Sequence, residues 1–299
     1  MPLLNIFFTI LLPIFVLMGI GFALDKVFHL DIQTLTRIGF YVFSPAVVFL
    51  MLVDSELQAS DLLSITGYTA AHAAVMAALG LALFSAQPFA AKRAVLIYGS
   101  IFYNAGNYGF PLMLLAFGQE AVGVSAIVLV VQIAVMFTVG LPFFTGERGL
   151  GRSLLRLAKT PVVYAVLLGL ALRGLNLDLS GPLAMPINRL GDAFIAMALL
   201  TLGAQLARSR FSGDGLSLVA GAAMRLVASP LVAAALVALL GLPADMRSVL
   251  IVGAGLPVAV NVSILAAEFD RAPEFTSQIV FWTTLLSAVT IPALLWLAG

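Results

Sequence analysis

The stretch Arg93-Ala-Val-Leu-Ile-Tyr-Gly99 returns later in the chain as Arg247-Ser-Val-Leu-Ile-Val-Gly253. Each copy leads into a membrane-length apolar segment that glycine, proline and asparagine interrupt. The chain is therefore an internal duplication with two matched interruptions. A broken helix leaves backbone groups unpaired, so it is tolerated at membrane depth only where protein or a cavity covers it. Paired breaks of this kind indicate the binding site of a membrane transporter.

The composition independently predicts a membrane protein. Of the 299 residues, 62% are apolar and 10% are charged, and the mean hydropathy is +1.12, far above the values of soluble domains. The chain has no cysteine, which excludes disulfides and thiolate metal sites. A formal net charge of +1 gives no indication of a nucleic-acid partner. We expect membrane lipid as the surrounding partner, no metal and no cofactor.

Apolar windows of about 20 residues, the length that crosses a bilayer, predict ten spans and an all-α membrane protein. The run from Leu3 to Leu24 is longer than the apolar core of a signal peptide, and we expect it to be the first span. The ten predicted spans are residues 3–24, 33–53, 61–84, 92–117, 121–144, 161–174, 183–207, 215–241, 246–268 and 275–298.

The duplication divides these spans into five plus five. Other matched segments include Asp61-Leu-Leu-Ser64 with Asp214-Gly-Leu-Ser217, and Ser125-Ala-Ile-Val128 with Ser277-Gln-Ile-Val280. Because five is odd, the second copy crosses the membrane in the opposite sense, which gives an inverted-topology repeat. We expect repeats at 1–145 and 161–299 with a linker at 146–160.

Basic residues in the short loops predict the orientation, since they mark cytoplasmic loops. Both termini are then extracytoplasmic, and the linker at 146–160 is cytoplasmic. The basic residues on the predicted cytoplasmic side are Lys26, Lys92, Arg93, Arg148, Arg152, Arg156, Lys159, Arg208, Arg210 and Arg271.

The fourth predicted span has the features of a helix interrupted at mid-membrane depth. It contains the amides Asn104 and Asn107, the glycines Gly106 and Gly109, and Pro111. Proline removes a backbone donor and glycine permits unusual dihedral angles. The amides can satisfy freed backbone groups or bind a solute. A simple proline kink is the alternative.

The ninth predicted span carries the same features at the same depth, which argues against two independent kinks. It contains Gly255, Pro257, Asn261 and Ser263. Asn107 and Asn261 are related by the offset that relates the two repeated motifs. We therefore predict that the fourth and ninth spans are broken and cross each other.

Two residues with polar or charged side chains lie at similar depth in repeat-related spans. His72 and Arg225 are each about 15 Å into a helix at 1.5 Å per residue. If the helices break at the midplane, the free N–H groups of their second halves attract anions. Arg225 would add positive potential, with Asp192 as its expected partner, and His72 would relay protons. Structural roles remain open for both, and a local pair between Asp192 and Arg189, three residues earlier, is the alternative.

At these residues the sequence resembles the auxin efflux carrier family along essentially its whole length. The resemblance lies in Asn104, Gly109 and Pro111 of the fourth span, in Leu256-Pro257 and Glu268-Phe269 of the ninth, and in the fifth-span segment Gln132-Ile-Ala-Val-Met-Phe-Thr138. It differs from plant carriers at Tyr103, where they have proline, and at Val258, where they have an amide.

The resemblance implies a fold in which a mobile core, spans 61–144 and 215–298, moves like an elevator beside a scaffold, spans 3–53 and 161–207. It also implies a homodimer in the cell's inner membrane, and carriage of a small organic anion such as malate, malonate or an auxin-like acid. The expected substrate-binding residues are Asn104, Asn107, Gln132, Val258, Asn261 and Ser263, and the helix-breaking residues are Gly106, Gly109, Pro111, Gly255 and Pro257.

Other functions remain open at this point. Neither interruption contains an acidic residue, so a carboxylate-built sodium site is not evident, and coupling to protons, to sodium or to neither ion is possible. A cation or proton antiporter on a related crossed-helix fold would need an acid at the crossing. A membrane sensor derived from a transporter is a further alternative. An enzyme is not expected, because the spans contain no HExxH, paired-aspartate or Ser-His pattern.

Overall fold

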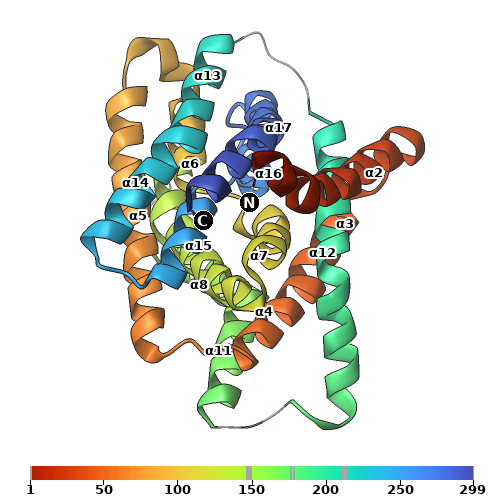
Figure 1. Ribbon diagram of the computed structural model, residues 1–299. Helices are drawn as coiled ribbons and strands as arrows, with labels where there is room; N and C mark the ends of the chain where they lie inside the picture. Colours follow the sequence, from red (N-terminus) through yellow and green to blue (C-terminus); the bar gives the residue numbers. More distant parts are fainter. Residues whose placement is uncertain (1, 146–149, 176, 178, 210–213, 299) are drawn as a thin grey trace.

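The computed structural model describes residues 2–145, 150–175, 177, 179–209 and 214–298 (Figure 1). Within these residues the secondary structure is helical, apart from one isolated antiparallel bridge between Tyr103 and Val258. This agrees with the predicted all-α class. Residues 146–149 of the expected linker, and with them Arg148, lie outside the described residues, as does Arg210 of the predicted cytoplasmic set.

Seven helical segments of the described chain are long and apolar enough to cross a membrane. Their lengths match the predicted spans because each is a continuous apolar run. The seven are α1–η1–α2 (Leu3–Phe28), α3–η2–α4 (Ile32–Val53), α5 (Ala59–Phe84), α8–η5 (Gln119–Gly140), η6–α12 (Gly181–Ala207), α13–η7–α14 (Gly215–Leu239) and α17 (Pro273–Ala298).

The remaining helices are shorter. They are η3 (Gln87–Lys92), α6 (Arg93–Ile101), η4 (Ala105–Gly109), α7 (Phe110–Phe117), α9 (Leu141–Thr145), α10 (Leu150–Ala158), α11 (Pro161–Gly174), α15 (Ala244–Ala254) and α16 (Val260–Glu268). The segments predicted as the fourth and ninth spans are thus each divided into two helices, α6 with η4–α7 and α15 with α16.

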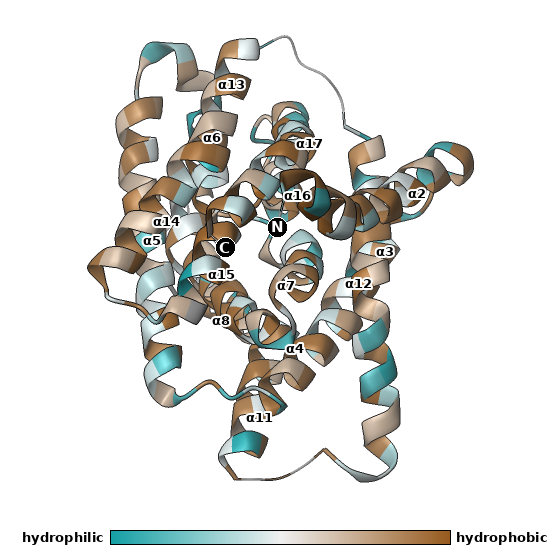
Figure 2. Cartoon of the chain, viewed as in Figure 1, coloured by the Kyte–Doolittle hydropathy of each residue, from teal (hydrophilic) through white to brown (hydrophobic). Residues whose placement is uncertain are grey.

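Large apolar side chains cover much of the outer surface. Leu63, Val139 and Leu239 are each more than 65% exposed, and apolar residues run along most helices in Figure 2. Such surfaces aggregate in water but are stable against lipid. The chain is therefore a multi-pass membrane protein.

The helices pack in two groups. In the first, α2 packs on α12, and α4 packs on α11 and α12. A Cβ atom added at Gly203 would lie 1.9 Å from the carbonyl oxygen of Met18, and one at Gly21 would lie 2.0 Å from that of Leu200. Only glycine permits this approach of α2 to α12, as is common between membrane helices.

The second group contains the two interrupted helices. Here α5 packs on α6, α8 and α14, while α7 packs on α8, α14 on α15 and α16 on α17. Interrupted helices that contact several neighbours keep their freed backbone groups away from lipid.

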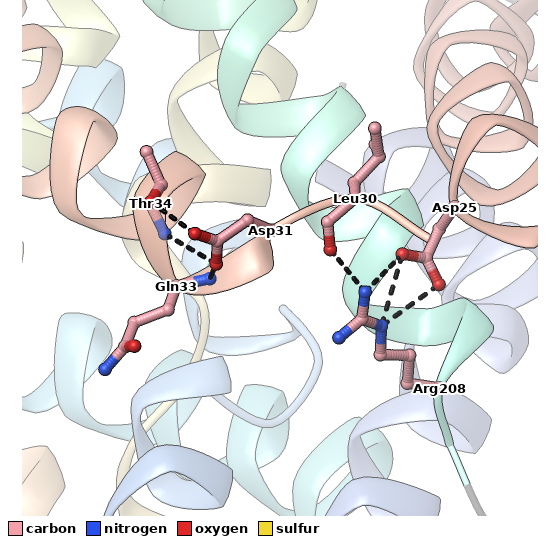
Figure 3. A network of polar contacts seen from close by, with 6 residues as sticks. All are labelled: Asp25, Leu30, Asp31, Gln33, Thr34 and Arg208. Atoms are coloured by element: carbon pink, nitrogen blue, oxygen red, sulfur yellow. Dashed lines mark hydrogen bonds and ion pairs between the residues drawn. The ribbon is translucent and has the colours of Figure 1, made fainter. Parts of the chain in front are cut away.

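Ion pairs fix the ends of the connection between α12 and α13. Arg208 donates to both carboxylate oxygens of Asp25, with Nη2 2.8 Å from Oδ1, and also to the carbonyl oxygen of Leu30 (Figure 3). At the other end, Lys92 Nζ lies 2.5 Å from Asp214 Oδ2. The Lys92 ammonium is the largest cause that lowers the pKa of Asp214, to about 2. The first pair joins the end of α12 to α2, and the second joins the start of α13 to η3.

The same view contains the cap of α3. Asp31 Oδ1 accepts from the backbone N–H groups of Gln33 and Thr34, at 3.1 and 3.3 Å (Figure 3). An aspartate in this position satisfies donors that a helix start leaves unpaired. The cap therefore fixes where the second apolar helix begins.

Candidate functional site: the crossing of two interrupted helices

The two interruptions lie against each other as short extended segments. Asn104 N donates to the carbonyl oxygen of Pro257 at 2.9 Å, and Ala259 N donates to that of Phe102 at 3.1 Å. Two more N–H groups are satisfied by side chains. Tyr103 N donates to Gln132 Oε1 at 3.2 Å and Val258 N donates to Thr283 Oγ1 at 3.2 Å. The crossing thus pairs backbone groups that would otherwise be costly to bury.

The first break lies earlier than the sequence predicts. Residues 102–104 are not helical, whereas Gly106 and Gly109 lie in η4, and Pro111 lies in α7, which continues η4 because Gly109 and Phe110 both have helical dihedral angles. Proline inside a helix removes a backbone hydrogen bond, and a local π-helical turn such as η4, directly before Pro111, accommodates it. Pro111 therefore lies past the break, inside the second half-helix, and its role in holding the break open stays a prediction. In the second break, Gly255 ends α15 and Pro257 lies in the extended segment, as expected.

Gly109 allows the two interruptions to pack closely. A Cβ atom there would lie 2.9 Å from Leu256 Cδ1 and 3.3 Å from the carbonyl oxygen of Asn104. Any larger side chain would displace Leu256, which lies in the other interruption. Gly109 therefore contributes close packing rather than the break itself.

On one side of the crossing, the C-terminal ends of α6 and α15 converge on Arg225. Its side chain is fully buried. Nη1 donates to the carbonyl oxygen of Ser100 at 2.6 Å, and Nη2 donates to the carbonyl oxygen of Ala254 and to Ser229 Oγ. The guanidinium carbon also lies 4.9 Å from the centre of the Tyr103 ring. Arg225 thus caps the last turns of both helices, where carbonyl groups lack intrahelical partners.

His72 belongs to this same buried side. Its Nε2 lies 3.1 Å from Ser229 Oγ and 3.2 Å from the carbonyl oxygen of Ser229. Its ring stacks on Tyr68 and meets Tyr103 edge to face. His72 and Arg225 therefore contact the same serine and the same tyrosine.

On the opposite side, both second half-helices begin at a pocket. Asn104 precedes η4, and Ala259 precedes α16. The cavity volume is about 80 Å³, below the roughly 300–1,000 Å³ of sites for drug-sized ligands. Twenty residues line this crossing pocket: Leu35, Thr36, Gly39, Phe40, Ser44, Tyr103, Asn104, Ala105, Gly106, Asn107, Leu129, Ile133, Val162, Phe194, Met197, Ala198, Thr201, Ala259, Val260 and Asn261.

Two side-chain amide groups at the crossing have N–H donors that make no hydrogen bond among the described residues. Nδ2 of Asn104 and Nε2 of Gln132 are buried without a hydrogen-bond partner among the described residues. Asn107 is half-buried and Asn261 is exposed, and both line the pocket. Buried amides are normally satisfied, so unpartnered ones beside a pocket are candidates for binding a solute.

Three predicted binding residues do not line this pocket. Gln132 holds the Tyr103 backbone, and the fully buried Val258 forms the backbone bridge to Tyr103. Ser263 Oγ donates to the carbonyl oxygen of Val260, one turn back in α16. Gln132 and Val258 thus support the crossing.

The expected pairing of Asp192 with Arg225 is wrong. Asp192 is exposed, and its Oδ2 lies 3.5 Å from Nη1 of Arg189, the local alternative. The hydrogen bonds of the Arg225 guanidinium go instead to carbonyl and hydroxyl oxygens. Equal depth along two helices does not make their side chains neighbours, because helices at the same depth can lie far apart laterally.

Sequence reasoning did not identify the wall opposite the crossing. This wall contributes the hydroxyl groups of Thr36, Ser44 and Thr201 to the pocket. Single hydroxyl residues in apolar helices are common, and they often bond to their own helix. The one available signal was Ser44 directly before Pro45 inside an apolar run.

A second hollow adjoins the crossing pocket and shares Thr36, Phe40, Ile133 and Asn261 with it. We call this hollow the vestibule. Its charged lining residues are Arg37, Arg156, Lys159 and Glu268. Three basic groups against one acid give it a positive balance, and such a field raises the local concentration of anions.

An all-helical chain with lipid-compatible surfaces and two interrupted helices that meet beside a pocket has the architecture of a membrane transporter. Residues 148–295 match the family described as "Membrane transport protein". The chain is also 30% identical over 302 aligned positions to an "Uncharacterized transporter" of Methanothermobacter thermautotrophicus, with 95% of each chain covered. This chain belongs to that family, the auxin efflux carrier family of membrane transporters.

Two further relatives have more specific names. The "Putative malonate transporter" of Rhizobium meliloti is 26% identical, with 86% of this chain and 84% of the relative covered. The "Probable auxin efflux carrier component 5c" of Oryza sativa is 31% identical over 50% of this chain and 41% of the relative. Both names refer to carriage of an organic acid or of auxin.

Proposed function

We propose that this protein is a secondary transporter of a small organic anion, a mono- or dicarboxylate of the size of malonate or malate, bound in the crossing pocket. The observation that carries the proposal is the donor-rich lining of the pocket. The N-termini of two half-helices meet there beside the side-chain Nδ2 of Asn104, which has no partner among the described residues. Helix N-termini favour anions, and none of the described residues lining the pocket is acidic.

The pocket size and the relatives support a small substrate. A volume of about 80 Å³ suits a compact carboxylate better than an aromatic auxin-like acid. One full-length relative is named for malonate. Asn104, Asn107 and Asn261 would bind the carboxylate groups, with Thr36, Ser44 and Thr201 on the opposite wall.

The proposal includes ten spans in two inverted repeats, residues 1–145 and 161–299, joined by 146–160. Residues 3–53 and 161–207 would form the scaffold, and 61–144 and 215–298 the mobile core. The location of the pocket supports this division. Its lining residues between 35 and 44 and between 162 and 201 form one wall, and those between 103 and 133 and between 259 and 261 form the other. Sliding of the core along the scaffold would move the pocket across the membrane as an elevator.

The vestibule would be the entrance from the cytoplasm. It is lined by Arg156, Lys159 and Thr160 at the end of the basic linker, and basic loops are cytoplasmic in most membrane proteins. Both termini would then be extracytoplasmic. We also propose a homodimer in the inner membrane, which native mass spectrometry of the protein in detergent would test.

A thermal-shift screen of the purified protein tests the proposed substrate class. The ligands are malonate, malate, indole-3-acetate and the neutral analogue malonamide, each with and without sodium and at two pH values. A ligand that binds the folded state raises the melting temperature by mass action. We expect malonate or malate to do so and malonamide not to. A shift with sodium or pH alone, and with none of the anions, would favour a cation antiporter instead.

Uptake of the radiolabelled anion into proteoliposomes then separates a transporter from a sensor. A transporter accumulates or exchanges label across the bilayer, whereas a sensor binds the ligand without moving it. The sodium and pH dependence of uptake identifies the coupling ion, if the transporter uses one.

A further inference from the structure

Arg225 is a buried cation whose partners are not carboxylates. It lies in η7 (Met224–Ala228), in the middle of the Gly215–Leu239 segment. In the described chain its guanidinium donates to the carbonyl oxygens of Ser100, Ile101 and Ala254 and to Ser229 Oγ. An arginine in this environment is expensive to insert, so its partners must compensate for a full positive charge.

The converging helix ends supply that compensation. A helix C-terminus is equivalent to about half a negative charge, so two ends that meet at one point amount to about one. Ser100 and Ile101 end α6, and Ala254 ends α15. The guanidinium contacts both ends at once. Its single positive charge therefore matches the combined charge of the two helix ends.

We propose that Arg225 is a tethered cation that occupies the position between the two helix C-termini, where a transporter without it would need a bound inorganic cation. Unwound carbonyls and half-helix C-termini are the groups that bind coupling cations in transporters with broken helices. In this chain the cation is covalently part of the protein. It holds α6 and α15 together at the crossing. The partial negative charge of the two helix C-termini is then neutralised without sodium from the solution.

Arg225 also acts on the pocket through Tyr103. The guanidinium lies against one face of the Tyr103 ring, and Tyr103 lines the crossing pocket on the other side of the break. Arg225 itself is not among the residues that line the pocket. It is thus a positioning residue that fixes the shape of the binding site.

Chemical rescue of Arg225→Ala tests the proposal without using any substrate. The variant leaves room for a small cation among the same oxygens. We expect a lowered melting temperature that guanidinium ion at about 10 mM, far below denaturing concentration, raises in a saturable way. Sodium or potassium should raise it less, because they lack planar donors. Wild type should show no rise with any of the three ions.

The matched control is Arg189→Ala, which removes an arginine from the exposed pair with Asp192. Its melting temperature should not respond to guanidinium, because a solvated carboxylate does not retain a free ion. If guanidinium, sodium and potassium all fail to stabilise Arg225→Ala beyond their effect on Arg189→Ala, the proposal is overturned.

A second pair of variants applies if Arg225→Ala does not fold. Arg225→Lys and Arg225→Met have similar side-chain volumes and differ in charge. We expect the yield of folded Arg225→Lys protein to be at least about tenfold higher than that of Arg225→Met. The reason is that hydrogen bonds from a charged group are stronger than those from a neutral one. Equal yields from the two variants would contradict the tethered-cation role.

The consequence for coupling depends on the proposed transport function. Uptake by wild type should be the same in sodium and in choline, and uptake by Arg225→Ala should require guanidinium or an inorganic cation. Rescue of stability without any uptake by wild type would refute the proposed substrate and leave the tethered cation intact. Uptake by wild type that requires sodium would refute the tethered cation's role in coupling.

Discussion

The two sides of the crossing differ in charge and in how that charge is satisfied. On one side, the C-termini of α6 and α15 end against the buried Arg225. On the other, η4 and α16 begin at the crossing pocket. There the side-chain Nδ2 of Asn104 has no partner among the described residues, and Asn261 is exposed. The same backbone break thus produces a closed, neutralised side and an open side with free donors. Substitutions on the first should alter stability, and those on the second should alter binding.

Replacement of Arg225 by Met should have the largest effect. Several charge-assisted hydrogen bonds disappear at once, and buried carbonyls at two helix ends lose their partners. By analogy with broken buried ion pairs, we expect a loss of roughly 3–5 kcal/mol in the free energy of unfolding. Denaturant titration in detergent micelles measures it. A loss below about 1 kcal/mol would mean that water or another group replaces the guanidinium.

Replacement of Asn104 by Ala should separate binding from stability. It removes a donor that has no partner among the described residues, so the ligand-free protein should not lose stability and should gain slightly. Binding of the substrate anion should weaken about tenfold, since one hydrogen bond to a charged group is lost. Isothermal titration calorimetry and melting curves give the two numbers.

Ser100→Ala is the matched control for Asn104→Ala. Ser100 lies on the closed side, and its hydroxyl donates to Leu96 in its own helix. Its removal should leave anion binding unchanged. Equal losses of affinity in the two variants would mean that binding does not distinguish the two sides of the crossing.

Replacement of Asn107 or Asn261 by Ala should test whether both half-helices contribute to the site. Each asparagine follows a half-helix N-terminus at the pocket, and the two are related by the repeat. We expect each single change to weaken anion affinity by about five- to tenfold. Unchanged affinity and uptake in both folded variants would exclude the crossing as the substrate site.

Replacement of Arg156 and Lys159 by Gln should have a smaller, salt-dependent effect. These residues line the vestibule and not the crossing pocket, and solvated charges act mainly on the rate of association. We expect uptake to fall about two- to threefold at low ionic strength and to approach wild type at about 0.5 M salt. A deficit that salt does not reduce would indicate direct contact with the substrate.

Replacement of Asp192 by Asn should have the smallest effect. The pair with Arg189 is 3.5 Å long and its side chains are 77% and 70% exposed. Exposed pairs contribute little to stability. Uptake and melting temperature should both equal those of wild type. A large loss of uptake would restore Asp192 as a functional residue.

The sequence by itself determined the membrane class, the positions of the apolar helices and the existence of two matched breaks. These properties follow from local causes. A run of about 20 apolar residues is stable as a helix in lipid, and clustered glycine, proline and asparagine make a continuous helix poor. The repeated motif at Arg93 and Arg247 also indicated that the breaks correspond to each other.

Only the tertiary structure decided where the chain breaks and which groups meet there. The first break lies at 102–104 because this segment pairs with Pro257, Val258 and Ala259, more than 150 residues away in the sequence. Pro111, the strongest local signal, lies instead inside the second half-helix, after the π-helical turn η4. Asp192 had the right depth for Arg225 but pairs locally, while the helix ends that bind Arg225 carry no distinctive side chains. Backbone carbonyls are present at every residue, so their convergence on a cation follows from packing and leaves no trace in the sequence.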